Sequence, residues 1–215
     1  MQCFSHWIII DEIKKTTKTP GGICIRVKIC GITSVKDAKI AEKLGADAIG
    51  VVVFSDSLRS VSIERALMIF SSLGPFTTTV AVTHSTKNDE INKILGISPD
   101  AVQVSSDIPV NGNSKVIRVA RPGHPLPIDC DAVLIDASLG RGILFDKDFA
   151  LEIKGRSNVP VLLAGGLRPD NVRDAIRKIH PYAVDVATGV EDSPGIKNEN
   201  LVREFIKNSR ETENE

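Results

Sequence analysis

The 215-residue sequence lacks a net charge and lacks any long apolar run. Its 27 basic residues balance 27 acidic ones, so no overall field draws the chain to nucleic acid or to an anionic membrane. The longest apolar stretches, such as residues 48–54, fall far short of the roughly 20 residues that a membrane helix needs. We therefore expect small-molecule partners, with no nucleic acid and no membrane among them.

Signals for secretion and for metal binding are also missing. The apolar stretch over residues 7–10 is too short for a signal-peptide core, and acidic residues follow it where a cleavage site would begin. The expected location is therefore cytoplasmic. The four cysteines, Cys3, Cys24, Cys30 and Cys130, include no CxxC pair and no histidine at metal-ligand spacing. We expect no metal site and no disulfide framework, and free thiols instead.

From Arg26 onward the sequence alternates short β-branched runs with longer amphipathic segments. This alternation is typical of repeated β-then-α units and a parallel sheet. Start signals mark three helices, because Ser34 precedes residues 35–44, Ser62 precedes residues 63–73, and Pro169 opens a segment that ends near residue 179. The predicted strands cover residues 26–30, 48–54, 77–82, 101–104, 115–119, 132–135, 159–164 and 183–186.

Eight such units predict an α/β fold, a single (β/α)8 TIM barrel over residues 26–215 that follows an N-terminal extension over residues 1–25. An open doubly wound sheet more often has about five or six strands and a GxGxxG turn after the first, whereas the turn here reads GITS. The links after the fourth and fifth strands contain Pro and Gly and are too broken for full helices, so reduced outer helices are expected there.

Polar residues stand at the carboxyl ends of three predicted strands, where barrel enzymes place their active sites. Cys30 ends the first strand, Asp136 follows the sixth, and Asp185 interrupts the eighth. Strand alternation directs Lys28 and Cys30 into the barrel, where an ammonium next to the thiol is expected to lower the pKa of Cys30. A cysteine often only packs, and an Asp at a strand end often caps a turn. Their convergence on one rim favours a catalytic interpretation of Cys30 and Asp136.

Glycine-rich turns follow the last two predicted strands. Gly165 and Gly166 come after the seventh strand, and Thr188 and Gly189 come after the eighth. Barrels commonly bind phosphate at these two loops through backbone N–H groups, which glycine lets approach an anion closely. Any tight turn could use a Gly-Gly pair, but two such loops side by side predict a phosphate as the ligand group.

The motifs at these positions resemble those of the phosphoribosylanthranilate isomerases of tryptophan biosynthesis. The resemblance extends from about residue 26 to the end of the chain. The matching motifs are VKICGIT (27–33), GADAIGVVV followed by SLRSVS (45–62), VLIDAS (133–138), LAGGLRPDNV (163–172) and VDVATGVEDSPGIK (184–197).

The resemblance implies an Amadori rearrangement of N-(5-phosphoribosyl)anthranilate, which opens the ribose ring and needs no cofactor. By resemblance, Asp136 protonates the ring oxygen and Cys30 removes the proton from C2. The resemblance further implies that Arg59 holds the anthranilate carboxylate and that Asp185 meets the anthranilate nitrogen. The phosphate contacts that it implies come from Gly166, Thr188 and Gly189. Members of the family occur as monomers and as dimers.

The chain departs from the family pattern in three places. The fourth strand reads AVQVSS, which keeps Gln103 but has Ser105 where the family usually has histidine. The third strand ends in VTHS, where we expect His84 at the surface. The loop after the sixth strand is shortened to SLGRGILFD, which keeps Gly140, Gly142, Phe145 and Asp146.

Two alternatives stay open. A related isomerase of histidine biosynthesis, or one that serves both pathways, typically uses two aspartates, so a cysteine at position 30 favours the anthranilate substrate. A degenerate paralogue that only binds phosphate is the other alternative, and the presence of Cys30, Arg59, Asp136 and Asp185 together counts against it. The helices have no sustained heptad pattern, so both a monomer and a homodimer remain possible.

Overall fold

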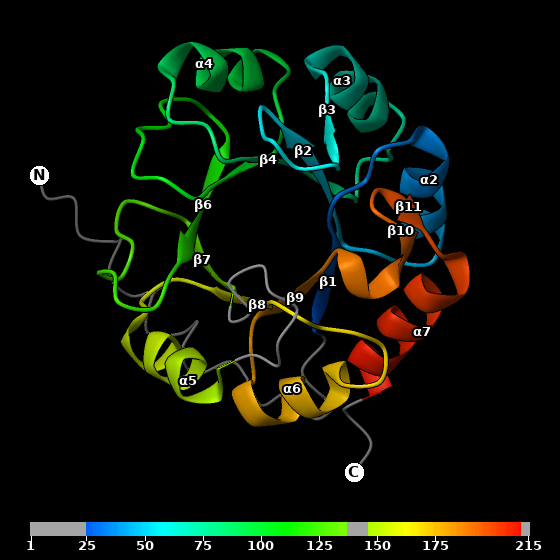
Figure 1. Ribbon diagram of the computed structural model, residues 1–215, viewed down its shortest axis with the longest axis vertical. Coiled ribbons are helices and arrows are strands. Elements are labelled where there is room, and N and C mark those ends of the chain that lie inside the picture. Colours follow the sequence, from blue (N-terminus) through cyan, green and yellow to red (C-terminus); the bar gives the residue numbers. More distant parts are fainter. Residues whose placement is uncertain (1–24, 137–145, 212–215) are drawn as a thin grey trace, which may run out of the picture.

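A computed structural model describes residues 25–136 and 146–211, and its strands form a closed barrel surrounded by helices (Figure 1). β1 pairs in parallel with both β9 and β2, which closes the ring of eight parallel strands. The predicted (β/α)8 barrel is therefore confirmed. The ring consists of β1 (Arg26–Ile29), β2 (Ala48–Val53), β4 (Thr78–Thr83), β5 (Ala101–Val104), β6 (Lys115–Ala120), β7 (Ala132–Asp136), β8 (Val161–Ala164) and β9 (Ala183–Val186).

The helices lie outside the ring and begin where side chains cap them. Ser34 accepts a hydrogen bond from the N–H of Asp37, and Ser62 accepts one from the N–H of Arg65, as the start signals predicted. The third predicted helix begins only at Val172, because Pro169 lies in the turn before it. The helices are α2 (Val35–Lys43), α3 (Ile63–Ser71), α4 (Asn88–Gly96), α5 (Lys147–Arg156), α6 (Val172–Ile179) and α7 (Glu199–Arg210).

No helix follows β5 or β6 before the next strand begins, as predicted, and the residues of both links are described. In Figure 1 only loops cover this side of the barrel, between α4 and α5. Arg118 of β6 points outward there, and its Nη1 and Nη2 donate to the carbonyls of Ser106 (2.6 Å) and Ile108 (3.1 Å). These two bonds fasten the link to the barrel wall where a helix is missing.

The strand residues divide into two hydrophobic layers, as their alternation predicted. Val27 and Ile29 are fully buried in the outer layer between strands and helices, and Val133 and Ile135 lie in the same layer. Cys30 belongs to the inner layer, inside the ring. At the carboxyl ends of the strands, the side chains of this inner layer face the space where a ligand can enter.

Several short elements were not predicted, because strands of two or three residues leave no readable periodicity. β3 (Ser60–Val61) pairs in parallel with the end of β2, and the 3-10 helix η1 (Thr188–Val190) leads into a hairpin of β10 (Glu191–Ser193) and β11 (Ile196–Lys197). β8 begins later than predicted, at Val161, because Pro160 has no N–H to donate to a neighbouring strand.

Two predicted features lie outside the described residues: nearly all of the N-terminal extension, and Gly140, Gly142 and Phe145 of the loop after β7. Asp146 is described, and its carboxylate caps α5 by accepting from the N–H groups of Asp148 and Phe149. Within the described ranges, no helix has both the length and the apolar character to cross a membrane.

Candidate active site

A cavity of about 590 Å³ opens at the carboxyl ends of the barrel strands. Four of the residues predicted from the sequence line it: Cys30, Arg59, Asp136 and Asp185. The structure thus brings together side chains from β1, β7 and β9 and from the loop after β2. The other described residues that line it are Gly31, Val52, Val82, His84, Gln103, Ser105, Val119, Arg121, Leu134, Ala164 and Ala187.

Cys30 follows β1 directly and is held by backbone contacts from both neighbouring strands. Its N–H donates to the carbonyl of Val186 at 2.8 Å, and the N–H of Ile32 donates to the carbonyl of Gly50 at 3.0 Å. A Cβ atom on Gly50 would lie 2.9 Å from the Cys30 Sγ and 3.0 Å from the Lys28 Nζ. The glycine in β2 therefore provides the space that the thiol and the ammonium occupy.

Replacing Gly50 by alanine is expected to displace the Cys30 thiol and to lower kcat by about tenfold or more, with a stability cost of about 1–3 kcal/mol from overpacking. Steady-state kinetics and chemical denaturation measure the two effects. Gly155→Ala in α5 is a matched control, because a Cβ there meets nothing within 4 Å. Unchanged turnover in Gly50→Ala would contradict the close packing around the thiol.

Lys28 and Asp185 form a buried ion pair next to Cys30, with 2.8 Å between Nζ and Oδ1. The two residues are in register on β1 and β9, and both side chains point into the barrel. Burial disfavours the charged ammonium, but Asp185 and Cys30 together outweigh this effect and raise the pKa of Lys28. Lys28 is thus a charged residue beneath the cavity whose charge is matched by Asp185.

The expectation of a lowered Cys30 pKa was wrong. Burial raises the pKa of the Cys30 thiol, and the opposing attraction of Lys28 does not reverse this effect. Asp185 also raises the thiol pKa, so it offsets part of the lowering that the Lys28 ammonium causes. Cys30 is therefore predominantly a thiol at neutral pH in the absence of a bound ligand.

The rate at which iodoacetamide alkylates Cys30 is accordingly expected to keep rising above about pH 8.5, where the rate for free cysteine levels off. The thiolate is the reactive form, and its fraction rises with pH until the raised pKa is passed. Peptide mass spectrometry separates this reaction from that of Cys130. A plateau in the rate below pH 8 would show that the thiol is activated after all.

Asp136 is the last residue of β7 and is half-buried at the cavity wall. It pairs in register with Ala164 of β8, while Leu134, two positions earlier on the same face, belongs to the inner layer. This position confirms the predicted inward direction of the carboxyl group. β9 and β8 lie between β1 and β7 in the ring, so Cys30 and Asp136 approach the cavity from separate directions.

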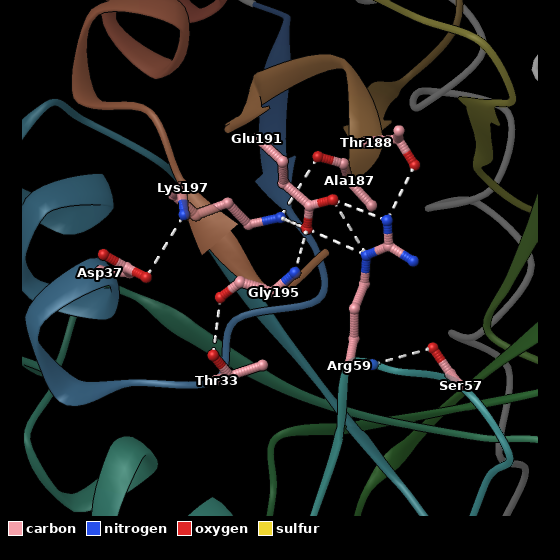
Figure 2. A network of polar contacts seen from close by, with 9 residues as sticks. All are labelled: Thr33, Asp37, Ser57, Arg59, Ala187, Thr188, Glu191, Gly195 and Lys197. Atoms are coloured by element: carbon pink, nitrogen blue, oxygen red, sulfur yellow. Dashed lines mark hydrogen bonds and ion pairs between the residues drawn. The ribbon is translucent and has the colours of Figure 1, made fainter. Parts of the chain in front are cut away.

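Arg59 lines the cavity but is also engaged by a residue that sequence reasoning did not assign. Its Nε donates to both carboxylate oxygens of Glu191 (2.9 and 3.1 Å), and its Nη2 donates to Oε2 at 2.6 Å. The same Nη2 donates to Oγ1 of Thr188 at 3.1 Å. The hydrogen bonds to Glu191 raise the pKa of Arg59. Figure 2 shows the other terminal nitrogen pointing away from Glu191.

The two glycine-rich loops meet beside the cavity. Gly165 and Gly166 have φ angles of 90° and 64°, a conformation that favours glycine. A Cβ on Gly189 would collide with the carbonyl oxygen of Leu167, so the loop after β9 lies directly against the loop after β8. The cavity wall includes Ala164 and Ala187, the residues that lead into the two loops. This arrangement leaves backbone groups of both loops near one edge of the cavity.

The far wall of the cavity, on β4, β5 and β6, carries polar residues that the sequence did not identify as functional. His84 is exposed, as expected, but it also lines the cavity, where its Nδ1 is 2.9 Å from Oγ of Ser105. Arg121 follows β6 and lines it too. A position just after a strand end was the only signal for Arg121, since its segment reads as an irregular link.

In the described part of the chain, no group of three or more His, Cys, Asp or Glu side chains is placed to hold a metal ion. The described cavity residues offer a thiol, carboxyl groups, guanidinium groups and the imidazole of His84. These groups suit proton transfer and anion binding.

Comparison with known proteins agrees with this chemistry. The family model of N-(5'phosphoribosyl)anthranilate (PRA) isomerase matches residues 125–208. The N-(5'-phosphoribosyl)anthranilate isomerase of Methanoregula boonei is 51% identical over 192 residues, which cover 88% of this chain and 98% of the relative. The chain belongs to the phosphoribosylanthranilate isomerase family.

Other phosphoribosylanthranilate isomerases agree in sequence and in structure. The protein from Pseudomonas fluorescens is 40% identical over 85% of this chain and 97% of its own. The crystal structure from Thermus thermophilus superposes with a TM-score of 0.77 at 31% identity, covering 86% of this chain and 98% of that one. A second solved isomerase, in complex with reduced 1-(o-carboxyphenylamino)-1-deoxyribulose 5-phosphate, has a TM-score of 0.73 at 31% identity, covering 87% and 99%.

Proposed function

We propose that this chain catalyses the Amadori rearrangement of N-(5-phosphoribosyl)anthranilate to 1-(2-carboxyphenylamino)-1-deoxyribulose 5-phosphate in tryptophan biosynthesis, with Asp136 as the general acid and Cys30 as the general base. One observation carries the assignment of these roles. Cys30 and Asp136 line the same cavity from β1 and β7, with a phosphate-type pair of glycine loops on the strands between them.

The proposed reaction begins with ring opening. Asp136 gives its proton to the ribose ring oxygen while the bond from C1 to that oxygen breaks, and the anthranilate nitrogen lone pair forms an iminium ion at C1. The positive charge makes the hydrogen on C2 acidic, and Cys30 removes it to give the enolamine. The ketone follows when a proton moves from the C2 hydroxyl to C1. Substrate and product are isomers, so the reaction consumes no oxidant or reductant.

The raised pKa of the Cys30 thiol works against forming the thiolate base before the substrate binds. The reacting form needs a thiolate at Cys30 and a proton at Asp136, and it carries the same number of protons as a form with a thiol and a carboxylate. The two forms therefore interconvert with no net uptake or release of protons, and the raised thiol pKa favours the second form. The iminium charge then favours the thiolate at the step where the base is needed.

The remaining residues bind the substrate in this proposal. Backbone groups of Gly165, Gly166 and Gly189 and the hydroxyl of Thr188 hold the phosphate. Arg59 binds the anthranilate carboxylate through the nitrogen that Glu191 leaves free. Asp185 accepts a hydrogen bond from the anthranilate nitrogen while Lys28 balances its charge.

The partners and the setting are also part of the proposal. The substrate is a phosphorylated small molecule, the location is the cytoplasm, and the barrel over residues 26–215 is the catalytic domain, with residues 1–25 as an extension. A solved structure from Thermotoga maritima is described as mutually generated monomers of a dimeric phosphoribosylanthranilate isomerase. For this chain we retain a monomer or a homodimer, which sedimentation velocity distinguishes.

A turnover assay tests the function directly. Purified protein is mixed with freshly generated phosphoribosylanthranilate, and the loss of substrate fluorescence is followed. Saturable turnover with this substrate is expected, and well-folded protein with no activity would refute the isomerase assignment. The aminoimidazole carboxamide substrate of the related histidine-pathway isomerase serves as the comparison, and comparable turnover of both would indicate an enzyme that serves two pathways.

A further inference from the structure

The hairpin of β10 and β11 carries two buried opposite charges that the proposed reaction does not use. The side chains of Glu191 and Lys197 are 2% and 1% exposed, and Nζ lies 2.7 Å from Oε1. Both residues belong to the GVEDSPGIK segment of the sequence. A buried ion pair is a weak source of stability, because desolvating two charges costs about as much as their attraction returns. The presence of this pair beside the cavity therefore calls for another reason.

The contacts of Glu191 converge on Arg59, as Figure 2 shows. Its carboxylate takes the Nε–Nη2 edge of the guanidinium, with the shortest distance, 2.6 Å, from Nη2 to Oε2. The second proton of Nη2 goes to Oγ1 of Thr188. A planar guanidinium held along one edge has a fixed orientation, so Nη1 is left to meet a ligand.

Glu191 is itself held from several sides. Lys197 donates from Nζ to Glu191 and to the carbonyl of Ala187 (3.2 Å), which lines the cavity. The N–H of Gly195 donates to Oε1 of Glu191 at 3.1 Å, and Thr33 donates to the carbonyl of Gly195 at 2.7 Å. The carboxylate cannot turn away from Arg59 without breaking these bonds.

The same network fixes the orientation of the Thr188 hydroxyl group. Because its Oγ1 accepts an N–H of Arg59, its own hydroxyl proton remains available for another acceptor. Thr188 opens η1, the turn that follows β9, where the phosphate is proposed to bind. In the proposed complex, Arg59 thus contacts the substrate carboxylate directly and the phosphate through Thr188.

We propose that Glu191, held in place by Lys197, is a positioning residue that fixes Arg59 so that Nη1 meets the substrate carboxylate while the Thr188 hydroxyl is left for the phosphate. This inference rests on the proposed function. It assigns no chemical step to Glu191, which acts through Arg59 alone.

Electrostatics support the arrangement. Burial works to raise the pKa of Glu191, but hydrogen bonds from Arg59 and Lys197 outweigh it and lower the pKa, so the carboxylate stays charged. Burial lowers the pKa of Lys197 despite the neighbouring carboxylate. Removing the charge of Glu191 would leave two cations, Arg59 and Lys197, next to each other, and Arg59 is the more exposed of the two.

Glu191→Gln tests the inference, because glutamine keeps the shape and one acceptor but loses the charge. The readout is the Kd for two ligands: reduced 1-(o-carboxyphenylamino)-1-deoxyribulose 5-phosphate and its analogue without the carboxylate. We expect the unmodified protein to prefer the first ligand, and Glu191→Gln to reduce that preference about tenfold, with KM raised and kcat changed less. A role confined to folding would weaken both ligands equally.

Two further variants complete the design. Glu199→Gln makes the same substitution in an exposed pair with Arg203 and is expected to leave both affinities unchanged. Arg59→Met is expected to abolish the carboxylate preference, and adding Glu191→Gln to it is expected to change nothing more, since coupled residues are not additive. Lys197→Met is measured in the same way and replaces Glu191→Gln if that variant fails to fold.

The outcomes separate the two claims. Suppose that Arg59→Met abolishes the carboxylate preference. The positioning role of Glu191 is then overturned if Glu191→Gln keeps the full preference, or if Lys197→Met keeps it where Glu191→Gln does not fold. The proposed function would then stand. If Arg59→Met keeps the preference, Arg59 does not bind the carboxylate and the positioning role falls with it. Failure of the proposed function itself appears separately, as the absence of turnover in the unmodified protein.

Discussion

Cys30→Ala is expected to lower kcat by at least about 100-fold, the lower end of the usual contribution of a general base. The side chain lies at the end of β1 in the cavity wall, and its backbone N–H is already satisfied by Val186, so the substitution removes the sulfur without disturbing a hydrogen bond of the main chain. Steady-state kinetics with generated phosphoribosylanthranilate measure kcat, and binding of the reduced product analogue checks that the site is intact.

Cys130→Ala is the matched control, because Cys130 is a second free thiol that packs against the outer hydrophobic layer. It is expected to keep normal turnover. Turnover of Cys30→Ala within a fewfold of the unmodified protein would remove Cys30 from the mechanism and leave it as a packing residue of the inner layer.

Asp136→Asn is expected to cause a loss of similar size, at least about 100-fold in kcat, because an amide of the same shape cannot supply an acidic proton to the ring oxygen. The step that should become slower is ring opening. A substrate analogue that is already open at C1 is therefore expected to bind Asp136→Asn nearly as well as the unmodified protein, which isothermal titration measures.

Asp131→Asn provides the comparison, since Asp131 lies just before β7 at the opposite end of the barrel. Its carboxylate binds Lys115 (2.8 Å) and the N–H of Val116, far from the strand ends that form the cavity. A small loss of stability with unchanged kcat is expected there. If Asp136→Asn also keeps its kcat, another group must protonate the ring oxygen.

The barrel was predictable because its strands carry their own periodicity. Val27 and Ile29 alternate with Lys28 and Cys30, so the inward and outward faces followed from a period of two. The same alternation placed Asp136 and Asp185 inside. Most strand boundaries lie within one residue of the prediction, and the start of β8 shifted further, because alternation ignores the missing N–H of Pro160.

The Cys30 pKa shows what such patterns leave out. The sequence places an ammonium and a carboxylate inside the barrel, but it does not show that they bind each other at 2.8 Å or how little water reaches the thiol. The shift depends on burial first and on the net effect of two opposite charges second. Its sign could only be obtained from the packed structure.

The network around Arg59 was not predictable for a related reason. Glu191 contacts Arg59 across 132 residues of sequence, and the short strands that carry Glu191 and Lys197 have no periodicity to reveal them. Arg121 was missed because it follows a strand end in a segment that reads as an irregular link, and His84 was expected only at the surface. Side chains that depend on long-range contacts need the fold before their neighbours are known.

The pairing of β1 with β9 links the order of synthesis to the assembly of the site. β1 leaves the ribosome early, but the groups that hold Cys30 and neutralise Lys28 belong to Val186 and Asp185, and Lys28 and Asp185 are 157 residues apart. A growing chain without β9 has a lysine that cannot be buried with its charge matched, and it has no closed ring to bury it in. The Cys30 thiol is therefore placed by one of the last strands to be made.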